Sequence, residues 1–241
     1  DPAALIVNGL DLSIAKGEVV ALVGESGSGK TMTAYSVLRL LPSAIQLVGG
    51  EILLGGQDVV GMEARQLREV RGTLASIIFQ EPMTSLNPLM TIERQIAEML
   101  LTHGKATRQT APARVIELLE LVRMPDARTR ARQYPHSLSG GLRQRAMIAL
   151  GLACEPQILI ADEPTTALDV TIQQQVMKLL LDLRDQLGMA ILLITHDLGV
   201  VAGLCDDVMV MYGGRVMEQA GAEALFDQPS HPYTVGLLGA V

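Results

Sequence analysis

One stretch of the sequence strongly limits the folds available to the chain. The apolar run EVVALVG at residues 18–24 leads into GESGSGKT, and a helical pattern follows it. The spacing G-x-x-x-x-G-K-T between a strand and a helix is typical of a loop that binds phosphate groups. Glycines let successive backbone N–H groups point at phosphate oxygens, and the helix N-terminus adds partial positive charge. The sequence therefore predicts a nucleotide site on an α/β fold.

We expect the whole of this loop to contact the nucleotide. Lys30 should reach the β- and γ-phosphates, and Thr31 should offer its hydroxyl to Mg²⁺. The predicted nucleotide-binding residues of the loop are Gly24, Glu25, Ser26, Gly27, Ser28, Gly29, Lys30 and Thr31. The alternative is a glycine-rich turn with a solvated lysine, and the flanking strand and helix disfavour it.

Polar side chains end three further apolar runs. Gln80 ends SIIFQ, Asp162 and Glu163 end QILIADE, and His196 ends AILLITH. Because open α/β sheets bind ligands at the carboxyl ends of their strands, we expect these side chains to converge on the phosphate loop. Asp162 is predicted to hold Mg²⁺ with Thr31, and Glu163 to polarise an attacking water. His196 is predicted to sense the γ-phosphate, although a lone histidine is also commonly an ordinary polar residue.

Short aliphatic runs alternate with helical patterns, which predicts an α/β fold with a mostly parallel sheet. The expected strands are apolar on both faces, as strands covered by helices should be, and they span 18–24, 75–80, 157–163 and 190–196. Residues 5–14 and 49–59 alternate more and carry turn glycines, which favours an antiparallel β edge. A helix is expected over 171–187, with Gly188 ending it.

The segment 88–155 contains amphipathic patterns, such as TIERQIAEMLL and APARVIELLELV, and has no convincing strand. This pattern predicts a helical lobe inserted into a sheet domain that is formed by residues 1–87 and 156–241. With 241 residues, 49% of them hydrophobic, the chain can bury the large core that this organisation needs.

Composition and charge exclude several classes of protein. The net charge of −7 argues against a nucleic-acid binder, which usually carries a basic surface. Neither a membrane-spanning apolar run nor a signal segment is recognisable. Cys154 and Cys205 lack C-x-x-C spacing and favour free thiols in a cytosolic protein.

These motifs, with LSGG at 138–141, resemble those of the ATP-binding cassette (ABC) ATPases over essentially the whole chain. GESGSGKT looks like the Walker A loop, ILIADEP like Walker B, and TALD at 166–169 like the D-loop. The resemblance implies a P-loop NTPase (RecA-like) fold, with ATP and Mg²⁺ as ligands. It also implies catalytic roles for Glu163, His196 and Gln80, and Mg²⁺ contacts from Thr31, Gln80 and Asp162.

The family resemblance also implies two ATPase subunits arranged head to tail. In that arrangement Ser139, Gly140 and Gly141 would bind the ATP held by the phosphate loop of the partner chain. An identical and a related second ATPase both fit this pattern. An isolated monomer should then bind ATP but hydrolyse it poorly.

Two further stretches are similar to one branch of the family, the importers of oligopeptides, dipeptides, nickel and glutathione. These are FQEPMTSLNP at 79–88 and HPYTVGLLGAV at 231–241. The branch implies a location on the cytoplasmic face of the bacterial inner membrane, with two permease subunits and a periplasmic solute-binding protein. Peptides, nickel chelates, glutathione and opines all fit as the transported solute.

The sequence departs from the family pattern at its start. Residues 1–16 hold no aromatic side chain to stack on adenine, so we expect that residue to lie upstream and the chain to be trimmed at both ends.

Rival classes of protein fit the sequence less well. A GTP switch needs an Asn-Lys-x-Asp base reader, which is absent, and a small-molecule kinase gives LSGG no role. A soluble ABC-type ATPase with a mechanical role is disfavoured by the acidic charge, the lack of long coiled-coil insertions and the two branch motifs.

Overall fold

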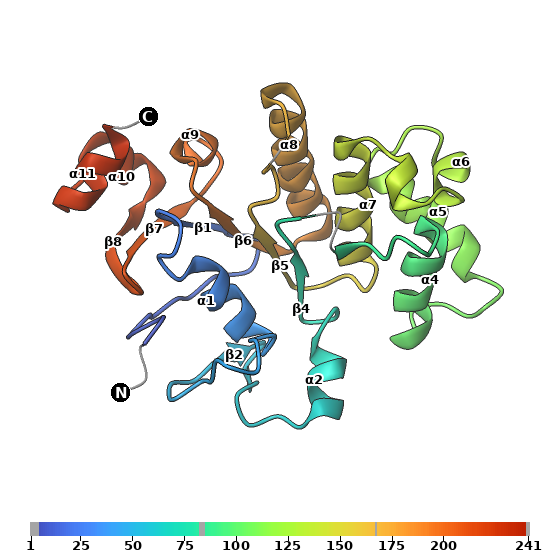
Figure 1. Cartoon of the computed structure of the whole chain (residues 1–241), viewed down its shortest axis with the longest axis horizontal. Coiled ribbons are helices and arrows are strands. Elements are labelled where there is room, and N and C mark those ends of the chain that lie inside the picture. The colour runs from blue at the N-terminus through green and yellow to red at the C-terminus, as the bar shows by residue number, and fades with distance from the viewer. Residues whose placement is uncertain (1–4, 82–84, 167, 240–241) are drawn as a thin grey trace.

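A computed structural model describes residues 5–81, 85–166 and 168–239 (Figure 1). The strands are β1 Val19–Val23, β2 Leu53–Leu54, β3 Gln57–Asp58, β4 Ala75–Ile78, β5 Ile158–Asp162, β6 Ala190–Thr195, β7 Asp207–Tyr212 and β8 Arg215–Gly221. The helices are α1 Lys30–Val37, α2 Ala64–Val70, α4 Ile92–Thr102, α5 Ala111–Leu121, α6 Ala127–Ala131, the 3-10 helix η1 Pro135–Ser137, α7 Gly140–Leu152, α8 Val170–Leu187, α9 Leu198–Val201, α10 Ala222–Asp227 and α11 Pro232–Leu238.

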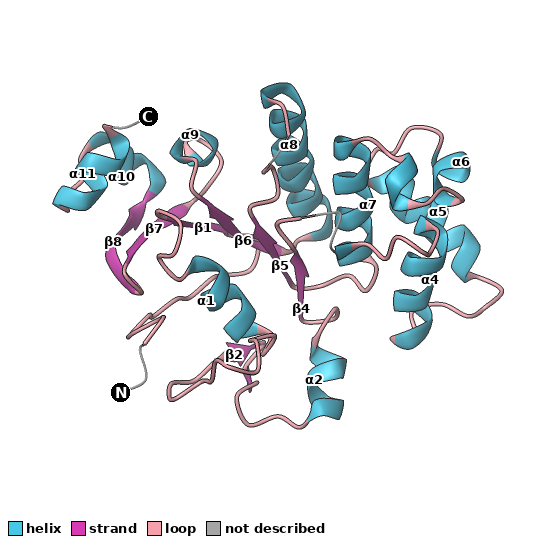
Figure 2. Ribbon diagram, viewed as in Figure 1, coloured by secondary structure: helices cyan, strands magenta, loops and turns pink. Residues whose placement is uncertain are grey.

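The main sheet has six strands in the order β4-β5-β6-β1-β7-β8, and only β8 runs antiparallel. In the register, Val23 pairs with Thr195 and Asp162 pairs with Ile194. The residues that follow β1, β5 and β6 therefore lie side by side at one edge of the sheet. The β-α-β crossovers place helices on both faces of this sheet, as Figure 2 shows.

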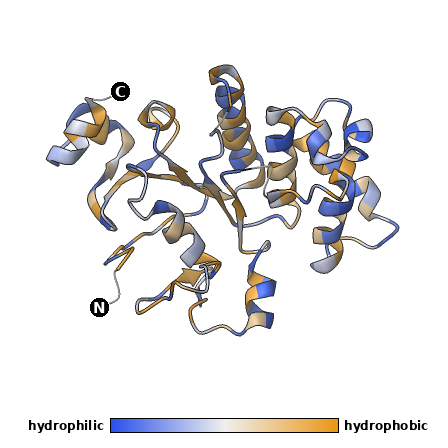
Figure 3. Cartoon of the chain, in the orientation of Figure 1, coloured by the Kyte–Doolittle hydropathy of each residue, from blue (hydrophilic) through white to orange (hydrophobic). Residues whose placement is uncertain are grey.

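Alternate residues of the central strands face opposite sides of the sheet and enter different cores. On β1, Val19 packs with the helices that include α7 and α8, whereas Val20 and Leu22 pack with α1 and β2. Ala21 and Val23 belong to a third cluster under α9 and α10. Figure 3 shows hydrophobic strands in the centre of the chain, with hydrophilic residues on the outer helices. The two-sided burial explains why the strands are apolar throughout.

The expected parallel strands are confirmed as β1, β4, β5 and β6. The helix predicted over 171–187 is confirmed as α8, which Asp169 caps through a hydrogen bond from the Ile172 N–H (3.0 Å) and which Gly188 ends with a φ of 63°. Residues 88–155 form α4 to α7 and η1, with loops between them and no strand among these described residues.

The antiparallel edge exists, but part of the prediction of its location is wrong. It is the β7–β8 hairpin, which the sequence patterns did not single out because methionine, at two of the six positions of DVMVMY, is not among the residues enriched in strands. The 49–59 stretch does form an antiparallel pair, β2–β3, in a separate two-stranded sheet. The 5–14 stretch is not a strand: its Leu10, Leu12 and Ile14 pack against a core cluster without a neighbouring strand to pair with.

Candidate nucleotide-binding and catalytic site

The phosphate loop leaves β1 at Gly24 and enters α1 at Lys30. Gly24, Gly27 and Gly29 have φ values of 149°, 80° and 103°, which L side chains rarely adopt. A Cβ atom at Gly24 would also lie 2.2 Å from the Met211 carbonyl oxygen. The backbone conformation therefore favours glycine at all three positions, and close packing against β7 also requires it at Gly24.

The turn between β7 and β8 supports the phosphate loop from behind. The Gly214 N–H donates to the Ser28 carbonyl oxygen (3.0 Å), and the Asn8 N–H donates to the Gly214 carbonyl oxygen (2.8 Å). Sequence reasoning missed this support, although the paired glycines of MYGGRV signal a tight turn. The β7–β8 turn thus holds the loop backbone at Ser28 and is itself held by Asn8.

The Lys30 side chain lies inside the loop and is only 5% exposed. Its Nζ donates to the carbonyl oxygens of Gly24 (2.7 Å) and Glu25 (2.9 Å). Burial lowers the pKa of this ammonium group, and the negative charges of Glu163 and Asp162 oppose the shift. The ammonium group is thus held by neutral carbonyl oxygens, which anionic phosphate oxygens can replace as stronger acceptors.

Asp162 ends β5 and lies fully buried beside the start of α1. Its Oδ1 accepts a hydrogen bond from the Thr31 hydroxyl (3.2 Å), while its Oδ2 has no hydrogen-bond partner in the described chain. Burial raises the pKa of the Asp162 carboxyl to about 6, against the Thr31 hydrogen bond and the charge of Lys30, which lower it. A buried carboxylate oxygen without a partner, next to a hydroxyl, is a donor set that suits a hard cation such as Mg²⁺.

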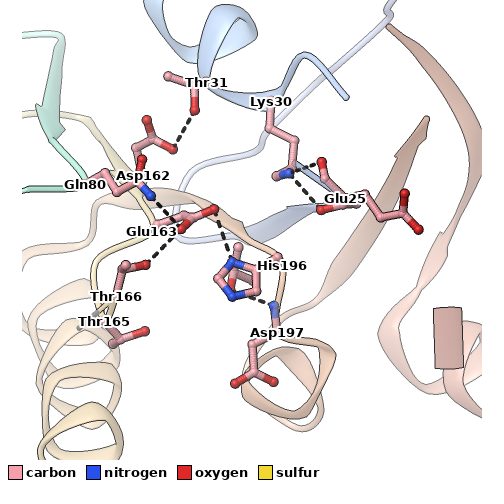
Figure 4. Close-up of polar contacts among 12 residues, drawn as sticks. Glu25, Lys30, Thr31, Gln80, Asp162, Glu163, Thr165, Thr166, His196 and Asp197 are labelled. Carbon is pink, nitrogen blue, oxygen red and sulfur yellow. Dashed lines mark hydrogen bonds and ion pairs between the residues drawn. The ribbon is translucent and has the colours of Figure 1, made fainter. Parts of the chain in front are cut away.

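Glu163 is the centre of a cluster of polar contacts (Figure 4). Its Oε2 accepts from Gln80 Nε2 (2.9 Å) and from Thr166 Oγ1 (2.8 Å). Its Oε1 lies 3.2 Å from Nδ1 of His196. The backbone of Glu163 has a φ of 45°, an uncommon conformation for a residue with a side chain. Since such strain persists where the surroundings impose it, the carboxylate is a candidate for a catalytic group.

The side chains around Glu163 come from separate elements. Gln80 follows β4 and His196 follows β6, and both contact Glu163. The side chains at the ends of these strands therefore converge at one edge of the sheet, as expected. Glu163 is 16% exposed at its side chain, whereas His196 is 60% exposed. Thr166 was overlooked as a contact of Glu163. A hydroxyl three residues after the glutamate, in a turn, was the available signal.

The signature residues lie elsewhere in the chain. Ser139 is exposed and precedes α7, and Gly140 and Gly141 form its first turn. A Cβ atom at Gly141 would lie 2.9 Å from Cγ2 of Ile172 on α8, so the glycine permits close packing of these two helices. Figure 1 shows α7 beyond β5, on the far side of the strands from α1. The fold thus gathers the phosphate loop, Gln80, Asp162, Glu163 and His196, and leaves the signature apart from them.

Parts of three predicted motifs fall outside the described residues. These are Ala167 in TALD, residues 82–84 in FQEPMTSLNP, and residues 240–241 of HPYTVGLLGAV (the HPYT stretch, 231–241). The described side chains next to Gln80 line a cavity of about 460 Å³, formed by Tyr35, Phe79, Gln80, Glu81 and Ser85. In the described part of the chain, no helix is long and apolar enough to cross a membrane.

Parallel strands, a glycine-rich phosphate loop, and acidic residues at the end of a neighbouring strand together define a P-loop nucleoside triphosphatase. The comparisons with known proteins then give the family. Residues 7–166 match the family model described as ABC transporter, and the chain belongs to this family.

Named relatives resemble the chain over nearly all of its length. A probable peptide ABC transporter ATP-binding protein, y4tR of Sinorhizobium fredii, is 52% identical over 98% of this chain and 70% of that protein. The oligopeptide transport ATP-binding protein OppD of Salmonella typhimurium is 49% identical, with the same two shares covered. OppD of Haemophilus influenzae is 49% identical over 100% of this chain and 74% of that protein.

Solved structures agree with the family assignment. The ATP-binding cassette MJ0796, solved as a dimer in a post-hydrolysis state with ADP and Pi, superposes with a TM-score of 0.79 at 26% identity, over 90% of both chains. The cbiO1 protein of Clostridium perfringens, part of an ABC transporter complex, gives 0.79 at 29% identity, over 92% of this chain and 84% of that one. The chain is thus an ATP-binding subunit of the ABC transporter family and an ATPase. The expected fold class is confirmed, and a soluble mechanical ATPase is not favoured.

Proposed function

We propose that the chain energises the import of peptides through membrane permease subunits. The support is the identity of about 50% to peptide and oligopeptide transport ATP-binding proteins over almost the full chain. Nickel chelates and glutathione are the related solutes of the same branch. Cells in which this gene is deleted should lose uptake of labelled oligopeptides, and the intact gene should restore it, whereas a Lys30→Ala version should not. Normal peptide uptake in the deletion strain would assign the chain to another solute.

The donor set at the sheet edge suits Mg²⁺ bound together with ATP. Thr31 and Asp162 would hold the ion, and Gln80 is a further proposed ligand through its amide oxygen. The ion would neutralise negative charge on the β- and γ-phosphates. Among the described residues, no group of three or more His, Cys, Asp or Glu side chains could hold a metal. A site with one carboxylate and one hydroxyl fits this ion, which commonly takes its remaining ligands from phosphates and water.

Hydrolysis is proposed to depend on Glu163, and the observation that carries this proposal is the contact cluster around its carboxylate. Three neighbours from three elements fix the orientation of Glu163 at the edge where the phosphate loop ends. A carboxylate held this way can accept a proton from a water molecule aligned on the γ-phosphate. Lys30 would exchange its carbonyl partners for phosphate oxygens, and His196 would contact the γ-phosphate.

The two-chain arrangement is proposed from the separation of the signature from the phosphate loop. Ser139 and the N–H groups of Gly140 and Gly141, at the start of α7, would bind the γ-phosphate of ATP on a partner ATPase. In this proposal residues 88–155 act as the signature lobe, and residues 1–87 and 156–241 as the catalytic lobe. The partner is an identical or a related ATPase, and no nucleic acid takes part.

The Ser139→Arg variant tests this arrangement in the assembled transporter. It places a bulky side chain at an exposed position, so the chain should fold and bind ATP normally while turnover by the transporter is lost. Ser137→Arg, two residues earlier and also exposed, is the matched control and should retain turnover. Full turnover with Ser139→Arg would contradict the two-chain site.

The position of the protein in the cell follows from the proposed partners. The chain would lie on the cytoplasmic face of the bacterial inner membrane, bound to two permease subunits that receive solute from a periplasmic binding protein. The stretch after Gln80, next to the cavity lined by Tyr35 and Phe79, is the proposed permease contact. Affinity purification of the tagged chain from detergent extracts should recover the permeases. Recovery of nucleic acid or ribosomes in their place would support the mechanical role.

A further inference from the structure

The HPYT stretch near the C-terminus lies against the phosphate loop, although about 200 residues separate them in sequence. The Tyr233 hydroxyl oxygen accepts a hydrogen bond from the backbone N–H of Glu25 (3.4 Å). Tyr233 belongs to α11, which packs near β7 and β8 at the end of the sheet opposite to β4 (Figure 1). The proposed mechanism of ATP hydrolysis gives the contact between Tyr233 and Glu25 no role.

The backbone around Tyr233 is held in place by several polar contacts. Both carboxylate oxygens of Glu218, on β8, are used: one accepts from the Ser230 N–H (2.7 Å) and the other from the His231 N–H (3.0 Å). His231 then caps α11, since its Nδ1 accepts from the Tyr233 N–H (3.1 Å). Burial alone would raise the pKa of Glu218, but the hydrogen bonds donated to its carboxylate lower that pKa overall. The glutamate therefore stays ionised and fixes the start of α11.

The Tyr233 ring is positioned by a second tyrosine. The ring centroids of Tyr212 and Tyr233 are 4.7 Å apart, with the planes inclined at 47°. Tyr212 is the last residue of β7, directly after Met211, whose carbonyl oxygen faces Gly24. Strand β7 thus contacts both the backbone of the phosphate loop and the ring of Tyr233.

The peptide group that joins Gly24 to Glu25 (the Glu25 peptide) has a contact on each side. Its N–H, that of Glu25, donates to Tyr233, and its carbonyl oxygen, that of Gly24, accepts from the Lys30 ammonium group at 2.7 Å. When Lys30 turns to a triphosphate, the carbonyl loses that partner, and the Tyr233 contact is the one that keeps the peptide in place. A backbone orientation fixed in advance reduces the ordering cost of ligand binding.

We propose that Tyr233 is a positioning residue for the phosphate loop, and that the HPYT stretch keeps the Glu25 peptide in the orientation that receives ATP. The proposal rests on the ATP-binding role of the loop and goes beyond it, because it assigns the C-terminal stretch to the nucleotide site. In this proposal Tyr233 acts through the backbone of the loop and not through direct contact with substrate or metal. Its effect should therefore appear in ATP affinity rather than in the chemical step.

Tyr233→Phe tests the proposal because it keeps the ring and removes only the hydroxyl. In the assembled transporter the KM for ATP should rise about two- to fivefold, as expected for one long neutral hydrogen bond, with kcat within twofold of the wild type. Tyr212→Phe is the matched control: it removes a hydroxyl from the tilted neighbouring ring and should leave both constants unchanged. An unchanged KM in Tyr233→Phe, an equal shift in both variants, or a fall in kcat alone would overturn the proposal.

A double-mutant cycle tests whether Glu218 acts through Tyr233. Glu218→Ala should release the start of α11 and raise the KM for ATP at least as much as Tyr233→Phe. The double variant should then be no worse than Glu218→Ala alone. If the two substitutions raised the KM for ATP multiplicatively, Glu218 would not act through Tyr233. Failure of peptide uptake would refute the proposed solute but leave these KM measurements interpretable.

Discussion

Substituting Thr166 by valine removes one contact of Glu163 with little change in side-chain shape. The Thr166 hydroxyl donates to Oε2 of Glu163 at 2.8 Å, and Gln80 donates to the same oxygen at 2.9 Å. A hydrogen bond to a charged group contributes roughly 1.5–3 kcal/mol, and each 1.36 kcal/mol is tenfold in rate. Because Gln80 and His196 still hold the carboxylate, we expect kcat to fall about tenfold, toward the lower end of that range.

The assay is steady-state ATP hydrolysis by the assembled transporter, with kcat and the KM for ATP measured separately. The KM should change little, because Thr166 has no contact with the phosphate loop among the described residues. Thr166→Ser is the control, since it keeps a hydroxyl at the same place and should retain most of kcat. If valine and serine gave the same kcat as threonine, the orientation of Glu163 would not depend on this bond.

Two further substitutions test the buried carboxylate and the signature glycines. Asp162→Asn should stabilise the chain without Mg²⁺ or nucleotide by up to about 3 kcal/mol at pH 8, because the raised pKa makes the ionised carboxylate unfavourable when folded. This gain in stability should shrink as the pH falls from 6 to 4, because the wild-type carboxyl becomes protonated over that range. Thermal denaturation in EDTA at pH 8 and at pH 4 measures the gain. Gly141→Ala should lower stability by about 1–3 kcal/mol through the 2.9 Å contact with Ile172, whereas Gly140→Ala, 3.3 Å from Leu168, should cost less. Equal denaturation midpoints for the two alanine variants would contradict the packing argument.

The parallel part of the fold and most of the catalytic edge were predictable from the sequence. Four short apolar runs have polar ends, a pattern that indicates buried parallel strands in an α/β chain: EVVALVG, SIIFQ, QILIADE and AILLITH. The parallel register then places Gln80, Glu163 and His196 together. Their contacts follow from topology, so no knowledge of side-chain packing was needed.

The parts that could not be predicted depend on contacts between distant segments. The 5–14 stretch alternates like a strand, yet Leu10, Leu12 and Ile14 pack against a core cluster, and the Asn8 N–H donates to the Gly214 carbonyl oxygen in the β7–β8 turn. The Tyr233 contact with Glu25 joins residues that are 208 positions apart in the sequence. The periodicity of apolar residues carries no information about such a pair. Local patterns predict elements, while tertiary contacts decide which of them pair.

The methionine-rich strand β7 illustrates a second limit. Met209 and Met211 are fully buried, as methionine that fills gaps in a core commonly is. Methionine is not among the residues enriched in strands, so the strand signal of DVMVMY comes only from Val208, Val210 and Tyr212. Its position next to β1 nevertheless makes it the direct support of Gly24.

The central claim is that Glu163 is the group on which ATP hydrolysis depends, and Glu163→Gln tests it most directly. The amide keeps the size of the side chain but cannot accept a proton from water. Equilibrium binding of labelled ATP and turnover by the assembled transporter should be measured on the same preparation. The account predicts that turnover falls at least about a hundredfold while ATP binding is retained. Turnover within twofold of the wild type would contradict it.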